Sequence, residues 1–129
     1  MPRKFKAHSR FSGPQLKAYE AAYHAALDLS VAASAKLRHL ALQADNLVQL
    51  STRRAQVFEA MRLTELLQVH HRAFLRDEFE AGVPDPAEIR GIAREAERIN
   101  AAAPTSENSE LIDRYLTKGL NAFGALHDY

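Results

Sequence analysis

The sequence predicts an all-α protein, and three observations support this. Its 129 residues include only five Gly and five Pro, and neither occurs between Gln15 and Ala81. That stretch is rich in Ala, Leu, Gln, Arg and Glu, all good helix formers. No segment alternates apolar with polar residues as a half-buried strand does. We therefore expect a bundle of four to five helices, with a long central helical hairpin or coiled-coil-like segment.

The first helix has a clear start. Ser12 can act as the N-cap, Pro14 suits the first turn, and Gln15 can reach back to close a capping box. The residues before it are basic and polar, so we expect residues 1–12 to form a flexible arm. Residues 13–129 are then a single helical domain, which is the usual outcome for a chain of this length.

The long middle of the chain cannot be one straight helix in a compact domain. At 1.5 Å per residue, a helix over residues 15–81 is on the order of 100 Å long. It must fold back on itself or build an extended oligomer. Asp45-Asn46 can host a turn and Ser51 can cap a new helix, so we expect a break between residues 45 and 52. Gly82 suits the left-handed position after a helix that ends near Ala81.

Two further helices follow. Asp85 can cap, Pro86 fits the first helical position, and Glu88 can complete a capping box. This predicts a helix from about 86 to 102. Several capping residues follow Pro104, and they predict a last helix from about 109 to 127.

Apolar positions from Leu16 to Leu47 recur with the spacing of a seam that packs on another helix. The middle of this seam is built from small residues, which allow two helix backbones to approach closely. They are Ala26, Ser30, Ala33 and Ser34. The seam predicts a core-facing helix rather than a cofactor groove.

The segment from Leu50 to Phe79 is apolar on two faces. One face carries Leu50, Val57, Phe58, Met61, Leu75 and Phe79, and the other carries Leu63, Leu66, Leu67, His70 and Phe74. A helix with two apolar faces must be covered on both, either within a bundle or by a partner. We assign the second face to a partner interface. An aspartate at Leu67 is then expected to break assembly, whereas unfolding would identify that face as core.

Sequence patterns for catalysis and metal binding are missing. There is no cysteine, no Gly-x-Ser-x-Gly elbow and no Gly-rich phosphate loop between a strand and a helix. Two histidines four residues apart on a helix would suggest a metal site, but this spacing does not occur. We expect no enzyme activity, no cofactor, no metal and no small-molecule substrate.

The remaining interpretation is a cytoplasmic, non-enzymatic protein–protein interaction module, such as a small regulator, inhibitor, adaptor or chaperone. We expect it to act as a homodimer through an apolar helical face, and we expect no membrane among its partners. A buried His70 would make that interface sensitive to pH, because histidine titrates near neutral pH. High alanine and arginine content suggests a bacterial or phage source.

The alternative is a nucleic-acid-associated protein. The N-terminal arm carries four cations without an acid, namely Arg3, Lys4, Lys6 and Arg10. Such an arm would contact phosphates, and its binding would be weak and salt-sensitive.

Overall fold

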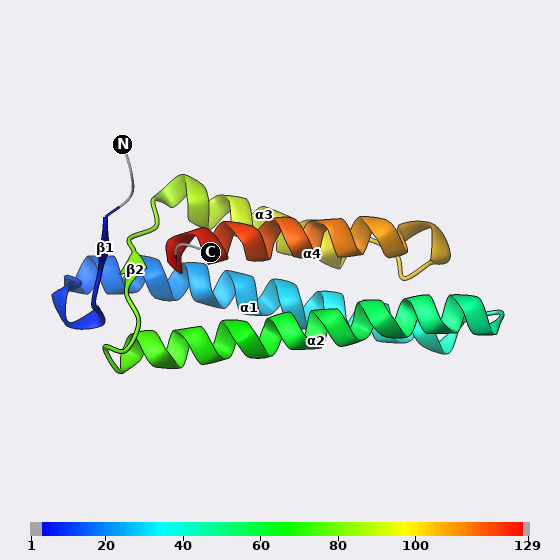
Figure 1. The fold of residues 1–129 in the computed structure, drawn as a ribbon. Coiled ribbons are helices and arrows are strands. Elements are labelled where there is room, and N and C mark those ends of the chain that lie inside the picture. The colour runs from blue at the N-terminus through cyan, green and yellow to red at the C-terminus, as the bar shows by residue number, and fades with distance from the viewer. Residues whose placement is uncertain (1–3, 128–129) are drawn as a thin grey trace.

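Four helices packed against one another make up the fold, which confirms the predicted all-α bundle. The computed structural model describes residues 4–127, and Figure 1 shows their arrangement. The helices are α1 (Gly13–Leu42), α2 (Leu47–Leu75), α3 (Pro86–Ala101) and α4 (Ser109–Gly124). Three 3-10 turns and two very short strands join them: η1 (His8–Arg10), η2 (Ser106–Asn108), η3 (Ala125–His127), β1 (Phe5–Lys6) and β2 (Ala81–Gly82).

Both predicted capping boxes form. Ser12 Oγ accepts a hydrogen bond from the Gln15 backbone N–H at 3.2 Å, and Gln15 Oε1 accepts one from the Ser12 N–H at 2.9 Å. At the start of α3, Asp85 Oδ1 and Glu88 Oε1 make the equivalent exchange at 2.8 and 3.0 Å. These bonds satisfy amide groups that the first helical turn leaves without intrahelical partners.

The long middle folds back as a helical hairpin. Helix α1 ends at Leu42 and α2 begins at Leu47, so the turn occupies residues 43–46, where the sequence offered Asp45-Asn46. Asn46 caps α2, its side-chain Oδ1 accepting from the Gln49 N–H at 2.9 Å. The break therefore falls at the early edge of the expected window, and Ser51 lies inside α2.

The end of α2 differs from the expectation of a helix that reaches Ala81. The helix stops at Leu75, and Asp77 adopts a left-handed conformation with φ of 58°. The Glu78 N–H then donates to the Ala73 carbonyl at 2.9 Å, as in a Schellman motif. Gly82 is not the left-handed residue and belongs to β2 instead. Asp77 can take this role because short polar side chains tolerate that conformation.

Helix α1 is the central helix of the bundle. It lies between α2 on one side and the α3–α4 pair on the other, and α2 has little contact with α4 (Figure 1). Its small residues Ala26, Ser30 and Ala33 have no exposed surface. The predicted seam is thus the contact surface of α1. The helix from Leu47 to Leu75, which carries two apolar faces, is peripheral.

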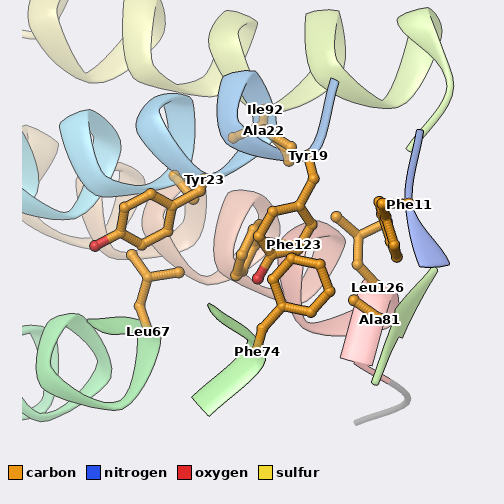
Figure 2. Packing of buried hydrophobic residues seen from close by; sticks show 11 residues of the cluster. Phe11, Tyr19, Ala22, Tyr23, Leu67, Phe74, Ala81, Ile92, Phe123 and Leu126 are labelled. Atoms are coloured by element: carbon orange, nitrogen blue, oxygen red, sulfur yellow. The ribbon is translucent and has the colours of Figure 1, made fainter. Parts of the chain in front are cut away.

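An aromatic cluster fills one end of the core. Tyr19 from α1 packs on Phe74 from α2, their ring centroids 4.2 Å apart, and Phe123 from α4 lies 5.8 Å from Tyr19. Phe11 contacts Phe74 edge-on at 5.0 Å (Figure 2). Such tilted and edge-to-face pairs contribute beyond the area that they bury. Three helices and the N-terminal segment are therefore joined at this end of the bundle.

The N-terminal segment packs against the bundle instead of extending away as the expected flexible arm. Phe5 and Lys6 form β1, which pairs antiparallel with β2 so that Phe5 lies opposite Gly82. The Ser9 N–H donates to Asp77 Oδ1 at 2.9 Å, and Phe11 is buried. These contacts tie residues 5–11 to the connection between α2 and α3.

We predict a difference in stability between alanine substitutions at two helical glycines. An alanine Cβ at Gly119 would lie 2.2 Å from Cδ2 of the fully buried Leu29, whereas one at Gly91 meets nothing within 4 Å. Both gain the helix propensity of alanine, so the gain cancels in the comparison. We expect Gly119→Ala to be less stable than Gly91→Ala by about 1–3 kcal/mol, the usual cost of overpacking. Urea unfolding of both variants measures this, and equal stability would contradict the close α1–α4 packing.

Candidate protein-interaction surface

The five residues predicted for a partner interface lie on the side of α2 that turns toward the rest of the chain. Leu67 and Phe74 are buried in the core cluster with Tyr19 and Phe123. Leu63, Leu66 and His70 are half-buried, and the two leucines line a cleft against α4. Leu67 and Phe74 therefore have almost no surface left for a partner in this fold.

The exposed apolar surface lies elsewhere on the same hairpin. Among the described residues, eight large hydrophobic side chains are exposed, and all of them belong to α1 or α2. They are Val31, Leu42, Leu47, Val48, Phe58, Met61, Val69 and Leu75. Three of these, Phe58, Met61 and Leu75, come from the first apolar face of α2, which the sequence analysis did not assign to a partner. This concentration on one hairpin follows from the position of α2, which packs chiefly on α1.

The turn of the hairpin is the most exposed part of this surface. Leu42 and Leu47 keep 82% of their surface exposed and Val48 keeps 78%. We call these three residues the hairpin tip. Just below it, the buried Arg53 donates to the Leu40 carbonyl at 2.8 Å and to Ser106 Oγ at 2.7 Å. Arg53 thus fixes the end of α1 and leaves the three aliphatic side chains pointing outward without cover.

A groove of about 610 Å³ runs between α1 and α2 on the outer side of the hairpin. We call it the α1–α2 groove. Its lining combines apolar and small residues with charged ones at its rim, namely Val31, Ser34, Ala35, Arg38, Met61, Thr64, Glu65, Gln68 and Arg72. The groove is thus wide enough for side chains of another helix, with both signs of charge available at its edges.

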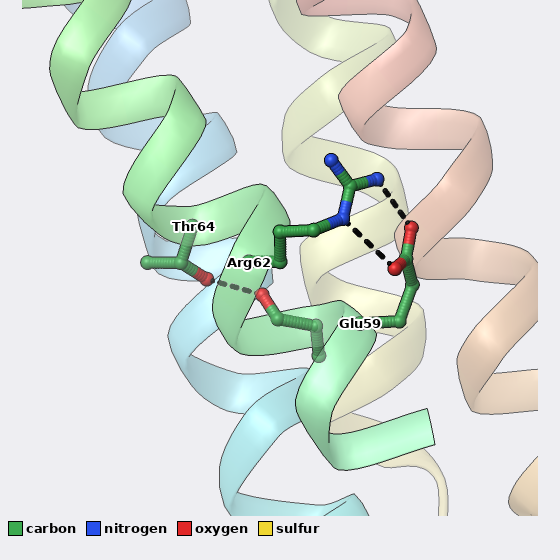
Figure 3. Close-up of polar contacts among 4 residues, drawn as sticks. Glu59, Arg62 and Thr64 are labelled. Carbon is green, nitrogen blue, oxygen red and sulfur yellow. Dashed lines mark hydrogen bonds and ion pairs between the residues drawn. The ribbon is translucent and has the colours of Figure 1, made fainter. Parts of the chain in front are cut away.

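The polar side chains beside the groove bond within α2. Arg62 donates from Nη2 and Nε to the two carboxylate oxygens of Glu59 at 2.6 and 3.0 Å, and Thr64 Oγ1 donates to the Ala60 carbonyl at 2.8 Å (Figure 3). The hydrogen bond from Arg62 lowers the pKa of Glu59. Both charged groups are solvated, so this pair contributes little to stability. Its effect is to hold Glu59 and Arg62 together on the surface of α2.

The histidines contribute to packing. His70 and His71 point in different directions, as neighbouring residues of a helix do: His70 stacks on Phe79 at 5.0 Å and His71 on Tyr23 at 3.6 Å. Burial lowers the pKa of His70. Within residues 4–127, no group of three or more His, Asp or Glu side chains converges as a metal site would require.

His127 is a buried polar residue that sequence reasoning missed. Its Nε2 lies 2.8 Å from the Tyr19 hydroxyl and its Nδ1 3.2 Å from the Glu80 carbonyl oxygen. Burial is the main cause that lowers its pKa to about 4. The charges of His70 and His71 also lower this pKa, to a smaller extent, whereas the hydrogen bond with the Glu80 carbonyl raises it. Its partners are 108 and 47 residues away along the chain, so no local pattern could have identified it.

Three of the four basic residues predicted for nucleic-acid contact lie in the described part of the N-terminal segment. Arg3 lies outside the described residues, and Lys4 and Arg10 are exposed. Lys6 donates to Gln15 Oε1 at 2.7 Å and sits over the Phe11 ring at 5.2 Å. Lys6 therefore has a structural role in the N-terminal segment.

No protein-family model, curated protein or solved structure matches the chain. No helix in the described part of the chain combines the length and the apolar character that crossing a bilayer requires. Function must therefore be inferred from the surface itself.

We predict that acid destabilises the fold through His127. Its pKa falls from 6.5 to about 4 on folding, so below pH 6.5 the unfolded chain binds the proton more readily than the folded one. Stability should be constant above about pH 6.5 and fall by about 3 kcal/mol as the pH approaches 4. Urea unfolding at pH 7.5 and 4.5 measures this loss.

A matched pair of variants isolates the effect. His127→Gln keeps groups that can bond to Tyr19 and Glu80 but does not titrate, so its stability should change less between the two pH values. His24→Gln removes a largely exposed histidine and should leave the loss unchanged. An equal pH response of wild type and His127→Gln would contradict the role of His127.

Proposed function

We propose that this protein is a non-enzymatic protein-interaction module, and that its contact surface is the outer side of the α1–α2 hairpin. The observation that carries this proposal is that all the exposed large hydrophobic side chains of the described chain lie on these two helices. Exposed apolar side chains gathered on one part of a protein commonly mark a site where another protein binds. Phe58 and Met61 are the proposed anchors, since large side chains of this type dominate interface energies.

A second copy of the chain is the occupant that we favour. The α1–α2 groove carries Arg38 and Arg72 together with Glu65. Two copies related by a two-fold axis present the same patch to each other, so a patch with both signs of charge can pair with itself. Helix packing would cover Met61 and Val31 and bring acids of one copy near bases of the other. The hairpin tip adds three more exposed apolar side chains to the same pair of helices.

We expect Met61→Asp to abolish self-association without unfolding the protein. The substitution replaces a proposed apolar anchor by a charge that dimer formation would have to desolvate, but Met61 is about half exposed in the single chain. Analytical ultracentrifugation over a wide concentration range measures the mass, and circular dichroism checks the fold. Wild type should approach the dimer mass with rising concentration, and the variant should stay a monomer.

Two further variants interpret the result. Ala122→Asp adds the same charge at an exposed position of α4 and should leave the mass unchanged. Leu67→Asp places the charge in the core. It should lower the free energy of unfolding by about 3 kcal/mol or more and so unfold the chain. A wild-type protein that stays monomeric at all concentrations would refute self-association. A Met61→Asp variant that still dimerises would refute the assigned surface.

A further inference from the structure

A small cleft lined by several charged side chains lies between α3 and α4, away from the α1–α2 groove. Its volume is about 240 Å³, and we call it the α3–α4 cleft. Cations and glycines from both helices line it, namely Gly91, Arg94, Glu95, Arg98, Lys118, Gly119 and Ala122. Nothing lies within 4 Å of where a side chain at Gly91 would begin, so the cleft is open on that wall.

Glu95 is buried beside this cleft with one oxygen unsatisfied. Its side chain is only 5% exposed. Its Oε1 contacts Arg98 Nη1 at 3.0 Å and Lys118 Nζ at 3.4 Å. Its Oε2 is buried and has no hydrogen-bond partner among the described residues. A buried acceptor without a partner costs about 1–3 kcal/mol, and more when it is charged. A ligand that donates a hydrogen bond would satisfy Oε2, once the exposed Arg98 and Lys118 side chains that contact the carboxylate move aside to admit it.

The charge of the cleft favours an anion. Three cations, Arg94, Arg98 and Lys118, line it against the single carboxylate of Glu95. Arg98 and Lys118 keep 43% and 68% of their side-chain surface exposed while they contact Glu95. Glu95 thus positions these two cations and leaves them able to reach a ligand. Arginine and lysine side chains gathered in this way are typical of sites for phosphate and carboxylate groups.

These two requirements restrict the ligand to an anion that also carries a proton to donate. A phosphate group that retains a P–OH meets both, because its charged oxygens suit the cations and its hydroxyl suits Glu95 Oε2. Sulfate has the same shape but no proton near neutral pH, and a phosphodiester has no P–OH. We propose that the α3–α4 cleft binds a protonated phosphate group, as free hydrogen phosphate or as a phosphomonoester. Glu95 is the specificity-determining residue of this site.

The test is a titration of the full chain with inorganic phosphate or sulfate at pH 6.5 and constant ionic strength. Backbone amide NMR signals of Gly91 and Gly119 report on the cleft directly. We expect phosphate to shift both signals and to bind about tenfold or more tightly than sulfate, the ratio that a hydrogen bond to a charged group corresponds to. Glycerol 2-phosphate forms a third arm, since a phosphomonoester still keeps part of its last proton near its second pKa of about 6. Tighter binding of inorganic phosphate would identify free hydrogen phosphate as the ligand, and tighter binding of glycerol 2-phosphate would identify a phosphomonoester.

Glu95→Gln tests the hydrogen bond itself. The amide offers a donor where Oε2 accepted, so the preference for phosphate over sulfate should disappear or reverse. Glu97→Gln changes an exposed neighbour on the same helix and should keep the preference. Lys118→Met removes an exposed cation and should weaken both anions together, and circular dichroism checks that the loss of its contact with the buried Glu95 leaves the fold intact.

Three outcomes would overturn the proposal. Equal binding of phosphate and sulfate by wild type would mean charge attraction alone, with no hydrogen bond to Glu95. The absence of any shift at Gly91 and Gly119 would mean that the cleft takes no phosphate. Binding that Lys118→Met leaves unchanged would place the phosphate outside the cleft. None of these readouts depends on self-association through the hairpin.

Discussion

The close approach of the other helices to α1 is the constraint on which the rest of the structure depends. Small residues along α1 allow it, and Gly119 of α4 leaves no room for a side chain against Leu29. At the other contact, Lys36 of α1 donates to the carbonyls of Ile99, Asn100 and Ala102 at the end of α3. Carbonyl groups at the end of a helix have few intrahelical partners, and within the backbone that of Ile99 accepts from the Ala102 N–H at 3.2 Å. A cation there gives these carbonyls a donor and interacts favourably with the helix dipole. Because α3 and α4 occupy one side of α1, α2 is left to the other side with its outer face open.

Much of the fold followed from local sequence. The capping boxes at Ser12 and Asp85 set the starts of two helices, and the gap in Gly and Pro indicated the long hairpin. Two features were predicted wrongly, the end of α2 and the N-terminal segment, and both depend on contacts between distant parts of the chain. The left-handed residue at the end of α2 is Asp77, whose side chain binds Ser9, and the short strand at Phe5 pairs with Gly82. A local sequence pattern cannot predict the left-handed residue or the strand pairing, because each depends on a contact with a residue about 70 positions away.

The candidate surface could be predicted only in part. Sequence periodicity correctly identified two apolar faces on the 47–75 helix, but it could not decide which one the chain would cover. That decision rests on the side from which α1 approaches, and α1 covers Leu67 and Phe74 while leaving Phe58 exposed. Glu95 lies among Arg94, Glu97 and Arg98 in the sequence, and such a run of both charges by itself indicates a solvated helix face. The burial of Glu95 became visible only with α4 in place, since Lys118 contacts the same carboxylate from that helix.

The meeting of both ends of the described chain at β2 has a topological consequence. Strand β1 pairs with β2, and η3 contacts β2 as well, so residues 5 and 127 lie at the same end of the bundle, far from the hairpin tip (Figure 1). Chains with neighbouring ends tolerate circular permutation when the new opening falls in an exposed turn. Joining the ends by a short linker and opening the chain at residues 43–46 would keep every helix beside its present neighbours. Such a permuted chain would show whether the four helices pack in the same way when α1 and α2 are no longer joined by a covalent turn.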